Sequence, residues 1–340
     1  MYVAILHNRV ADDASESDRD VLVQVEVVAT ALEQLRHESA AISCDLDLQS
    51  LQNQLQRRPP DVVFNLVESL AGSDALGFVV PALLDRMNVP YTGSATVATF
   101  LTNHKLLAKQ RLSQAGLPTP VWFSDSPGVG SPPGAGHASG SVRPGDRFVI
   151  KAISEHASVG LDEHSLVTVT GQSELQGRLQ EFQRSLQRPC FAEQFIDGRE
   201  FNISLLADAG GCQVLPPAEI DFSTFPAEKP RLVGYRAKWD PTTFEFHNTP
   251  RRFGFPPQDG PLLERIGELA RACWGLFGLG GYVRVDFRVD PEGRPWILEV
   301  NTNPCLSPDA GFAAALQQAG IGSDEAVARI LTDALKAGPR

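Results

Sequence analysis

The sequence predicts an α/β protein with more than one domain. Apolar runs that suit buried strands, at 2–7 and 61–66, alternate with segments of helical periodicity at 21–37 and 76–87. This alternation is typical of a parallel sheet covered by helices. A chain of 340 residues is long enough for roughly two or three domains. The pattern G-x-G-x-x-G is absent after the first strand, so no dinucleotide site is expected there.

The composition excludes several classes of function. With 30 basic and 41 acidic side chains, the formal charge is −11, which gives little support to bulk nucleic-acid binding. No apolar run approaches the roughly 20 residues of a membrane span, and the N-terminus does not resemble a signal peptide. The five cysteines are far apart and form no C-x-x-C pair, which argues against a structural zinc site. We therefore expect a cytoplasmic protein that binds neither nucleic acid nor membrane.

The middle of the chain predicts further elements and two irregular stretches. A helix is expected at 103–115, beginning near Thr102 and Asn103. Gly, Pro and Ser dominate 124–146, which favours a flexible insertion in a surface loop. Residues 222–258 lack periodicity and indicate a long loop, often a functional one. The other expected elements are strands at 147–152, 190–195 and 200–207, helices at 172–187, 261–277 and 323–336, and a hairpin at 282–301.

This hairpin alternates between apolar and charged residues. In its first strand, Arg284 and Asp286 lie on the face opposite the valines. Residues 290–293, Asp-Pro-Glu-Gly, supply the turn. On the return strand, 295–301, Leu298 and Val300 are expected on the apolar face. Glu299 and Asn301 are then expected on the charged face.

The register of the hairpin determines what its charged face can bind. Keeping apolar residues together places Asp286 opposite Glu299, or one diagonal from it. Two carboxylates, the Asn301 amide and Arg284 then share one face. Oxygen ligands of this kind suit Mg²⁺, which fills its remaining positions with phosphate and water. A solvated face with Arg–Asp cross-strand pairs would give the same alternation, so the hairpin alone leaves both interpretations open.

Arg284-Val-Asp286 and Glu299-Val-Asn301-Thr-Asn-Pro304 resemble the metal site of ATP-grasp enzymes. The resemblance is strongest to the D-alanine–D-alanine ligase family, whose pattern is R-x-D followed by E-x-N-T-x-P-G. Other family motifs have similar segments here, in the same order along the chain. They are Pro90–Ser94, His104-Lys105, Phe148–Lys151, Ser154–Gly160, Glu193–Glu200 and Tyr235–Lys238.

The resemblance implies an ATP-grasp fold of three α/β domains around a central cleft. Residues 1–95 would form a preATP-grasp domain with a parallel sheet, which binds substrate. Residues 96–191 would form the central ATP-grasp subdomain, which contains the 124–146 insertion. Residues 192–340 would form the C-terminal ATP-grasp domain, with the metal site and the mobile loop 222–258.

The resemblance also implies roles in binding metal and phosphate. Asp286, Glu299 and Asn301 would hold two Mg²⁺ ions across the β- and γ-phosphates, with Mn²⁺ as an alternative ion. Lys105 and Lys151 would pair with the α- and β-phosphates as compact charges on flexible stems.

Two residues have implied catalytic roles. Lys238 would reach the γ-phosphate when the 222–258 loop closes. Arg284 would stabilise the oxyanion of the tetrahedral intermediate. The remaining ATP contacts implied by the resemblance are Ser158 in the phosphate-covering loop, Glu193 at the adenine amino group, Phe195 and Ile196 at the ring edge, and Glu200 at the ribose.

Departures from the family pattern gather on the amino-acid side of the site. Ala157 and Trp239 stand where the family has two hydroxyls, and His156 occupies a glycine position. Near the acceptor carboxylate, Cys305 replaces a glycine and Ala310 a serine. These four neighbours of the substrate, His156, Ala157, Trp239 and Cys305, are candidates for substrate contact.

The first loop, 7–16, also lacks the family's glycines and its ammonium-binding glutamate. Asp12, Asp13 and Glu16 are candidates to replace that glutamate. Each orphaned polar group weakens binding of the same ligand by roughly 1–3 kcal/mol. We therefore expect an ATP-dependent carboxylate–amine ligase that forms an acyl phosphate. It would join an amino acid, or a similar carboxylate, to an amine, and its substrates would not be two D-alanines.

Two other interpretations stay open. The first is a D-alanine–D-alanine ligase of peptidoglycan synthesis with unusual substrate residues. The second is an ATP-binding protein without catalysis, although such a protein would not need an oxyanion arginine at 284. The expected partners are small-molecule carboxylate and amine substrates, and a homodimer is also left open.

Overall fold

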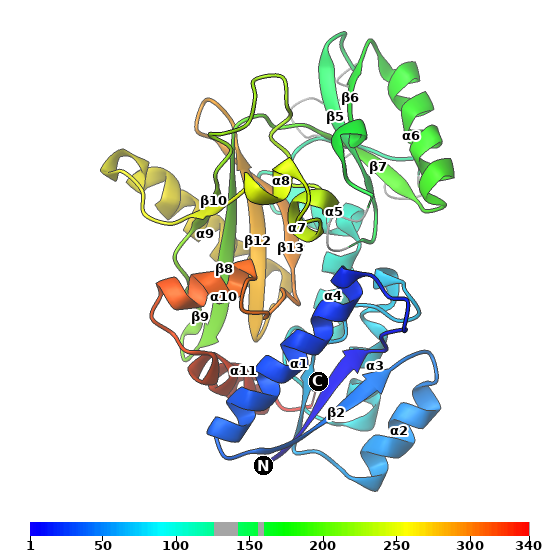
Figure 1. Ribbon diagram of the computed structural model, residues 1–340, viewed down its shortest axis with the longest axis vertical. Coiled ribbons are helices and arrows are strands. Elements are labelled where there is room, and N and C mark those ends of the chain that lie inside the picture. The colour runs from blue at the N-terminus through cyan, green and yellow to red at the C-terminus, as the bar shows by residue number, and fades with distance from the viewer. Residues whose placement is uncertain (126–141, 156–159, 340) are drawn as a thin grey trace.

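Three sheets with packed helices organise the computed structural model, which describes residues 1–125, 142–155 and 160–339. Figure 1 shows the N-terminal sheet at one end of the long axis. The six-stranded sheet lies in the middle, and the four-stranded sheet lies beyond it at the other end.

The N-terminal sheet is parallel. Its strands are β1 (Tyr2–Asn8), β2 (Glu38–Cys44) and β3 (Val62–Asn65), in the order β2-β1-β3. Its helices are α1 (Glu16–Gln34), α2 (Leu48–Arg57) and α3 (Val79–Met87), with a short 3-10 turn, η1 (Asp74–Leu76). The predicted parallel α/β unit is confirmed. The sequence reasoning missed β2, a partly exposed strand whose residues make no continuous apolar run.

Helix α1 begins at Glu16, earlier than the predicted start at 21. The reason is a local cap, because the Ser15 side chain accepts a hydrogen bond from the Asp18 backbone N–H at 3.2 Å. The predicted 103–115 helix is confirmed as α5 (Lys105–Gln114), and a further helix just before it, α4 (Thr96–Asn103), was not predicted. They are separated at His104, whose backbone is extended and whose Nδ1 caps α5.

The second sheet is antiparallel, with order β4-β7-β5-β6. One helix, α6, covers it, and β7 runs across the expected domain boundary at 191. Within the expected 124–146 insertion, residues 126–141 lie outside the described residues. The elements are β4 (Trp122–Phe123), β5 (Asp146–Ala152), η2 (Glu163–Ser165), β6 (Leu166–Val169), α6 (Gln172–Leu186) and β7 (Cys190–Gln194).

The third sheet has six strands, ordered β11-β10-β8-β12-β13, with β9 paired to β8. Helix α9 packs apolar residues against one face, and the other face carries the charged side chains of the hairpin. The strands are β8 (Arg199–Asp208), β9 (Gly211–Val214), β10 (Ala218–Ile220), β11 (Arg251–Arg252), β12 (Tyr282–Val289) and β13 (Pro295–Asn301); α9 spans Gly260–Phe277 after η3 (Pro257–Asp259).

The region 222–258 is more ordered than a loop. It contains two short helices, α7 (Tyr235–Trp239) and α8 (Phe244–His247), and the edge strand β11. In Figure 1, α7 and α8 lie in front of the sheet, whereas α9 lies behind it. Sequence periodicity could not find helices this short, because each makes little more than one turn.

A β-bulge changes which side chains of β13 lie on each face of the sheet. The pairing runs Asp286 to Glu299 and then Phe287 to Ile297, so the register shifts by one residue. Ile297 is therefore fully buried in the core with Val300, and Leu298 lines the pocket on the other side. The prediction that Leu298 lies on the apolar face was wrong, because a strict two-residue alternation does not survive a bulge.

The C-terminal helices share a core with the N-terminal sheet. Residues of α10 (Gly311–Gln318) and α11 (Ser323–Ala337) pack with α1, β1 and β3 in one apolar cluster. Figure 1 shows α11 beside α1. The first core therefore draws on both ends of the chain, and it crosses the boundary expected near residue 95.

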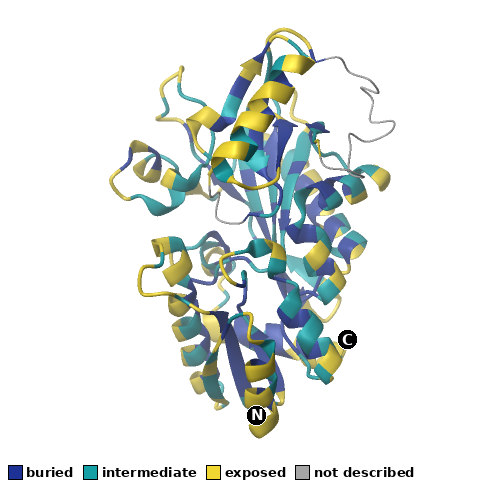
Figure 2. Ribbon diagram, turned by 90° about the vertical axis from the view of Figure 1, so that its right-hand side faces the viewer, coloured by how far each residue is buried: buried dark blue, intermediate teal, exposed yellow. Residues whose placement is uncertain are grey.

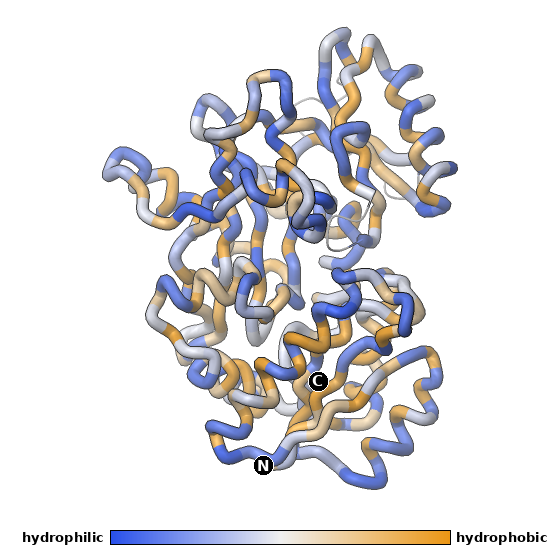
Figure 3. The backbone as a smooth tube through the Cα atoms, in the orientation of Figure 1, coloured by the Kyte–Doolittle hydropathy of each residue, from blue (hydrophilic) through white to orange (hydrophobic). Residues whose placement is uncertain are grey.

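Burial follows the layers of the fold. Figure 2 shows buried strands of the N-terminal sheet between helices whose outer faces are exposed. In Figure 3, the outlying helices α2 and α6 are largely hydrophilic. Each contributes only two buried leucines to its core, Leu51 and Leu55 from α2 and Leu175 and Leu179 from α6.

Candidate active site

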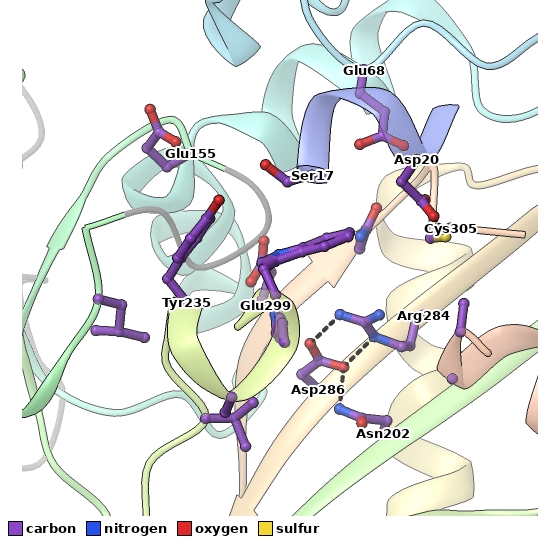
Figure 4. A pocket seen from close by; sticks show the side chains of 18 of the residues that line it. Ser17, Asp20, Glu68, Glu155, Asn202, Tyr235, Arg284, Asp286, Glu299 and Cys305 are labelled. Carbon is purple, nitrogen blue, oxygen red and sulfur yellow. Dashed lines mark hydrogen bonds and ion pairs between the residues drawn. The ribbon is translucent and has the colours of Figure 1, made fainter. Parts of the chain in front are cut away.

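A pocket of about 800 Å³ is lined by residues from all three sheet regions. The N-terminal region contributes α1 and the segment after β3, and the second sheet contributes the end of β5. The third contributes the hairpin, α7 and the start of α10. Figure 4 looks into this pocket.

The hairpin places its two carboxylates face to face. Asp286 pairs directly with Glu299 across the strands, as the sequence predicted. Arg284 donates to both oxygens of Asp286, from Nε at 2.7 Å and Nη2 at 2.9 Å. Asn202 on β8 donates to the same carboxylate at 2.8 Å, and Figure 4 shows both donors converging on it. This orients the carboxylate and fixes the arginine beside it.

The lysines expected at the phosphates approach the hairpin from different elements. Lys105 begins α5, and its Nζ lies 3.4 Å from Glu299. Lys151, near the end of β5, lines the pocket. Lys238 on α7 also lines it, and burial together with the positive charge of Arg284 holds its pKa below the ordinary lysine value.

Glu193 is a buried counter-ion in this structure. It is 2% exposed, accepts a hydrogen bond from Lys151 at 2.5 Å and forms an ion pair with the buried Lys109. Burial alone would raise the pKa of Glu193, but the two ammonium charges outweigh it and lower the pKa. The sequence reasoning did not find Lys109, which lies inside the apolar periodicity of α5. The adenine contact expected of Glu193 stays a prediction.

The other residues expected at the nucleotide already hold protein partners. Glu200 lines the pocket and pairs with Arg288 at 2.9 Å. The Ile196 carbonyl accepts from the same arginine, and the Phe195 N–H donates to the Arg147 carbonyl. Their contacts with ribose and adenine stay predictions. Of the phosphate-covering loop, His156, Ala157 and Ser158 lie outside the described residues.

Opposite the hairpin, the wall of the pocket is built on Asp20 of α1. Its carboxylate accepts from the Cys305 thiol at 2.9 Å, the Ser307 hydroxyl at 2.7 Å and the Gln24 amide at 3.2 Å. Figure 4 shows Asp20 beside Cys305, with Glu68 nearby. Gln24 also donates to Glu68 at 3.4 Å, and so it links the two carboxylates.

The environment of this wall changes the titration of Glu68. Burial raises the pKa of this carboxyl from 4.5 to about 7, and the nearby negative charges of Asp74 and Asp20 act in the same direction. Burial likewise raises the pKa of the Cys305 thiol. The thiol is therefore a hydrogen-bond donor to Asp20 and not a nucleophile at neutral pH.

The sequence reasoning chose the wrong acidic residues for this wall. Asp12, Asp13 and Glu16 do not line the pocket, whereas Asp20 and Glu68 do. One local feature could have indicated the wall. Gln24 falls in the buried stripe of α1 with Val21 and Val28, and a buried amide needs partners. Trp239 and Cys305, the described candidates for substrate contact, both line the pocket.

The hairpin can hold Mg²⁺ only if substrate phosphates and water complete the coordination of the ion. In the described part of the chain, no group of three His, Cys, Asp or Glu side chains could hold a metal ion. The hairpin offers two carboxylates and the Asn301 amide. Mg²⁺ commonly binds through one or two carboxylates together with substrate phosphates and water, and the donor set is of this kind.

A comparison with known sequences identifies the relatives of this chain. A family model described as the D-ala D-ala ligase C-terminus matches residues 147–332. A D-alanine–D-alanine ligase of Synechococcus sp. (strain JA-2-3B'a(2-13)) is 32% identical over 90% of this chain and 86% of its own. One from Gloeobacter violaceus is 31% identical over 96% and 98%. The uncharacterized protein y4sG of Sinorhizobium fredii is 28% identical over 86% and 82%.

Solved structures have the same fold. The D-alanine–D-alanine ligase from Bacillus anthracis, complexed with ATP, superimposes with a TM-score of 0.72 at 20% identity, covering 99% of this chain and 98% of that one. The ligase from Coxiella burnetii gives 0.69 at 16%, covering 99% and 96%. The fold and the hairpin define the class, which is an ATP-grasp ligase, an ATP-dependent enzyme that forms carbon–nitrogen bonds.

The chain belongs to the D-alanine–D-alanine ligase family. The predicted family and fold are therefore confirmed. The two relatives above that are at least 31% identical are both named D-alanine–D-alanine ligases. No helix of the described residues has both the length and the hydropathy to cross a bilayer.

Proposed function

We propose that this protein joins two amino acids through an amide bond while ATP is converted to ADP and phosphate. D-alanine is the first substrate to test at both positions, since several relatives are named D-alanine–D-alanine ligases. The observation that carries the proposal is the direct pairing of Asp286 with Glu299 beside Arg284. Lys151 and Lys238 line the same pocket.

The proposed reaction has two steps. First, a carboxylate oxygen of the acyl donor attacks the γ-phosphorus, the bond to the β–γ bridging oxygen breaks, and ADP leaves. Second, the amine of the acceptor attacks the acyl carbon and loses a proton. The carbon–oxygen bond then breaks, and phosphate leaves with its electron pair. The protein mainly has to position these groups and balance their charge.

The named residues fit the two steps. Lys238 is held among charged groups that include Glu299 and Arg284, from where its ammonium would stabilise the transferred phosphoryl group. Arg284 would balance the oxyanion that forms when the amine attacks. Asp286, Glu299 and Asn301 would hold Mg²⁺, which neutralises phosphate charge when bound.

One feature favours a second candidate in the same class, a ligase for other amino acids. The wall opposite the hairpin presents Asp20 and Glu68, with Cys305 bound to Asp20. The family pattern has a glycine at position 305. The cysteine side chain takes up space that a glycine would leave open, so a substrate other than D-alanine would suit this wall.

One substrate panel separates the candidates. The purified chain, ATP and Mg²⁺ are mixed with pairs of D- and L-amino acids and simple amines. Phosphate release is followed, and products are identified by mass spectrometry. D-alanyl-D-alanine as the main product supports the first candidate, and a different dipeptide supports the second. Phosphate release without any amide product, or no turnover with any pair, would contradict both.

A further inference from the structure

Arg251 is a cation of the pocket that the proposed reaction does not yet use. It lies on the edge strand β11, and its Nη1 donates to the Asp309 carbonyl at 2.8 Å. Its Nε lies 3.2 Å from where a side chain on Gly311 would begin. The guanidinium therefore lies across the first turn of α10, directly after Ala310.

The positive charge of Arg251 is balanced less closely than the charges of the neighbouring arginines. Arg284 holds Asp286 through two hydrogen bonds, and Arg252 pairs with Glu219. No carboxylate of the described residues forms an ion pair with Arg251. Arg251 is exposed on the edge strand, but the protein packed around its guanidinium and the nearby charge of Arg284 hold its pKa below the ordinary arginine value, while the negative charge of Asp309 acts in the opposite direction. Two guanidinium groups that face one pocket without a shared anion favour an anionic ligand between them.

The position of Arg251 indicates which anion this is. The lysines expected at the phosphates, Lys105 and Lys151, come from α5 and β5. Arg251 instead lies by Ala310 and lines the pocket together with Cys305. In the family pattern, position 310 is a serine and position 305 is a glycine, and both lie near the acceptor carboxylate. Ala310 has no hydroxyl, so an acceptor carboxylate would lack that partner here.

We propose that Arg251 binds the carboxylate of the amine substrate and takes over the part that a serine plays in the family pattern. The amine substrate is then an amino acid or a peptide, and simple amines are poor acceptors. The first turn of α10 adds backbone N–H groups to the same place, because no side chain caps it. This inference rests on the proposed function, since it assigns one half of the substrate pair.

The test compares each amino acid with its amide, which lacks the carboxylate charge. Binding of glycine, D-alanine, L-alanine and their amides is measured by calorimetry in the presence of a non-hydrolysable ATP analogue and Mg²⁺. The full-length wild type, Arg251→Gln, Arg251→Lys and Arg252→Gln are compared. Melting temperatures establish that each variant is folded.

We expect the wild type to prefer at least one acid over its amide by about 10-fold or more. Arg251→Gln should weaken binding of that acid about 10–100-fold and leave the amide almost unchanged, because a charged hydrogen bond is lost. Arg251→Lys should restore part of the preference. Arg252→Gln, on the same strand but paired with Glu219, should behave as the wild type.

Three results would overturn the inference. They are equal binding of acid and amide by the wild type, a preference that survives in Arg251→Gln, and no binding of any amino acid in the panel. Turnover decides the proposed function separately. If acids bind through Arg251 but no pair of substrates releases phosphate, the proposed function fails and this inference stands. If dipeptide forms while Arg251→Gln still prefers the acid over its amide, the proposed function stands and this inference fails.

Discussion

The two sides of the pocket are built in different ways. On the hairpin side, the charges come from two neighbouring strands and are largely matched by partners, as Arg284 is by Asp286 and Lys105 by Glu299. On the opposite side, Asp20 comes from α1 and Glu68 from the segment after β3. Neither of these carboxylates forms an ion pair with a cation of the described residues.

The difference suggests which function each side serves. A hairpin with its own counter-charges is ready to hold a group as highly charged as a triphosphate. A wall assembled from separate elements can change one residue at a time without disturbing the sheet. Activation of a carboxylate and choice of the amino acid are then separable properties, and substitutions on the two sides should have different consequences.

The largest effect is expected on the hairpin side, from Glu299→Gln. The rate of phosphate release should fall by about 10³-fold, because the carboxylate opposite Asp286 and beside Lys105 is lost. Glu292→Gln in the exposed turn is the matched control and should keep the wild-type rate. If the Glu299→Gln enzyme kept more than a tenth of the wild-type rate, the Glu299 carboxylate would not be needed for the reaction, and this prediction would be wrong.

Glu193→Gln tests the buried ion pairs that Glu193 forms with Lys109 and Lys151. Its free energy of unfolding should be lower by about 3–5 kcal/mol, because the buried Lys109 would lose its counter-charge. Urea unfolding at pH 7 measures the change, with the exposed Glu181→Gln as control. A loss below about 1 kcal/mol would show that Glu193 contributes little net stability.

The contribution of Glu193 to the free energy of unfolding depends on pH in a known direction. The pKa of Glu193 lies below its ordinary value of 4.5 in the folded protein. Its contribution to stability is therefore present above pH 4.5 and is lost as the pH falls toward the lowered pKa. The unfolding free energies of the wild type and Glu193→Gln should converge in acid.

Arg284→Lys should act on turnover more than on binding. We expect kcat to fall about 10²-fold with little change in the KM for ATP, because lysine cannot reproduce the two-point bond to Asp286 or present the same donors to an oxyanion. Steady-state kinetics measures both constants, with Arg294→Lys on the surface as control. A change confined to KM would instead assign Arg284 to ground-state binding.

The smallest effect is expected from Glu68→Gln, on the opposite wall. The pKa of Glu68 is raised from 4.5 to about 7, so its contribution to stability is complete below pH 4.5 and is lost as the pH rises through about 7. Above pH 7, the variant should exceed the wild type in unfolding free energy by about 1–3 kcal/mol. Parallel pH profiles for wild type, Glu68→Gln and the exposed Glu264→Gln would test this, and a flat difference would contradict it.

The sequence predicted the site where its chemistry is local. Two adjacent strands and a short turn bring Asp286 and Glu299 together, so the register follows from apolar pairing and turn length. The same reasoning failed at Leu298, because a bulge one pair away from the site is set by contacts that periodicity does not contain. It failed again in the first loop, because a serine cap starts α1 early and brings Asp20 to the pocket.

The sequence by itself determined the class of protein, the paired carboxylates and four of the cations near them, Lys105, Lys151, Lys238 and Arg284. These features depend on short-range order and on residue types at constant spacing. Only the tertiary structure decided that Gln24 joins Asp20 to Glu68, that Lys109 lies under Glu193, and that Arg251 faces the pocket. The physical reason is that these contacts form between elements distant in the chain, whose approach is set by packing of the whole core.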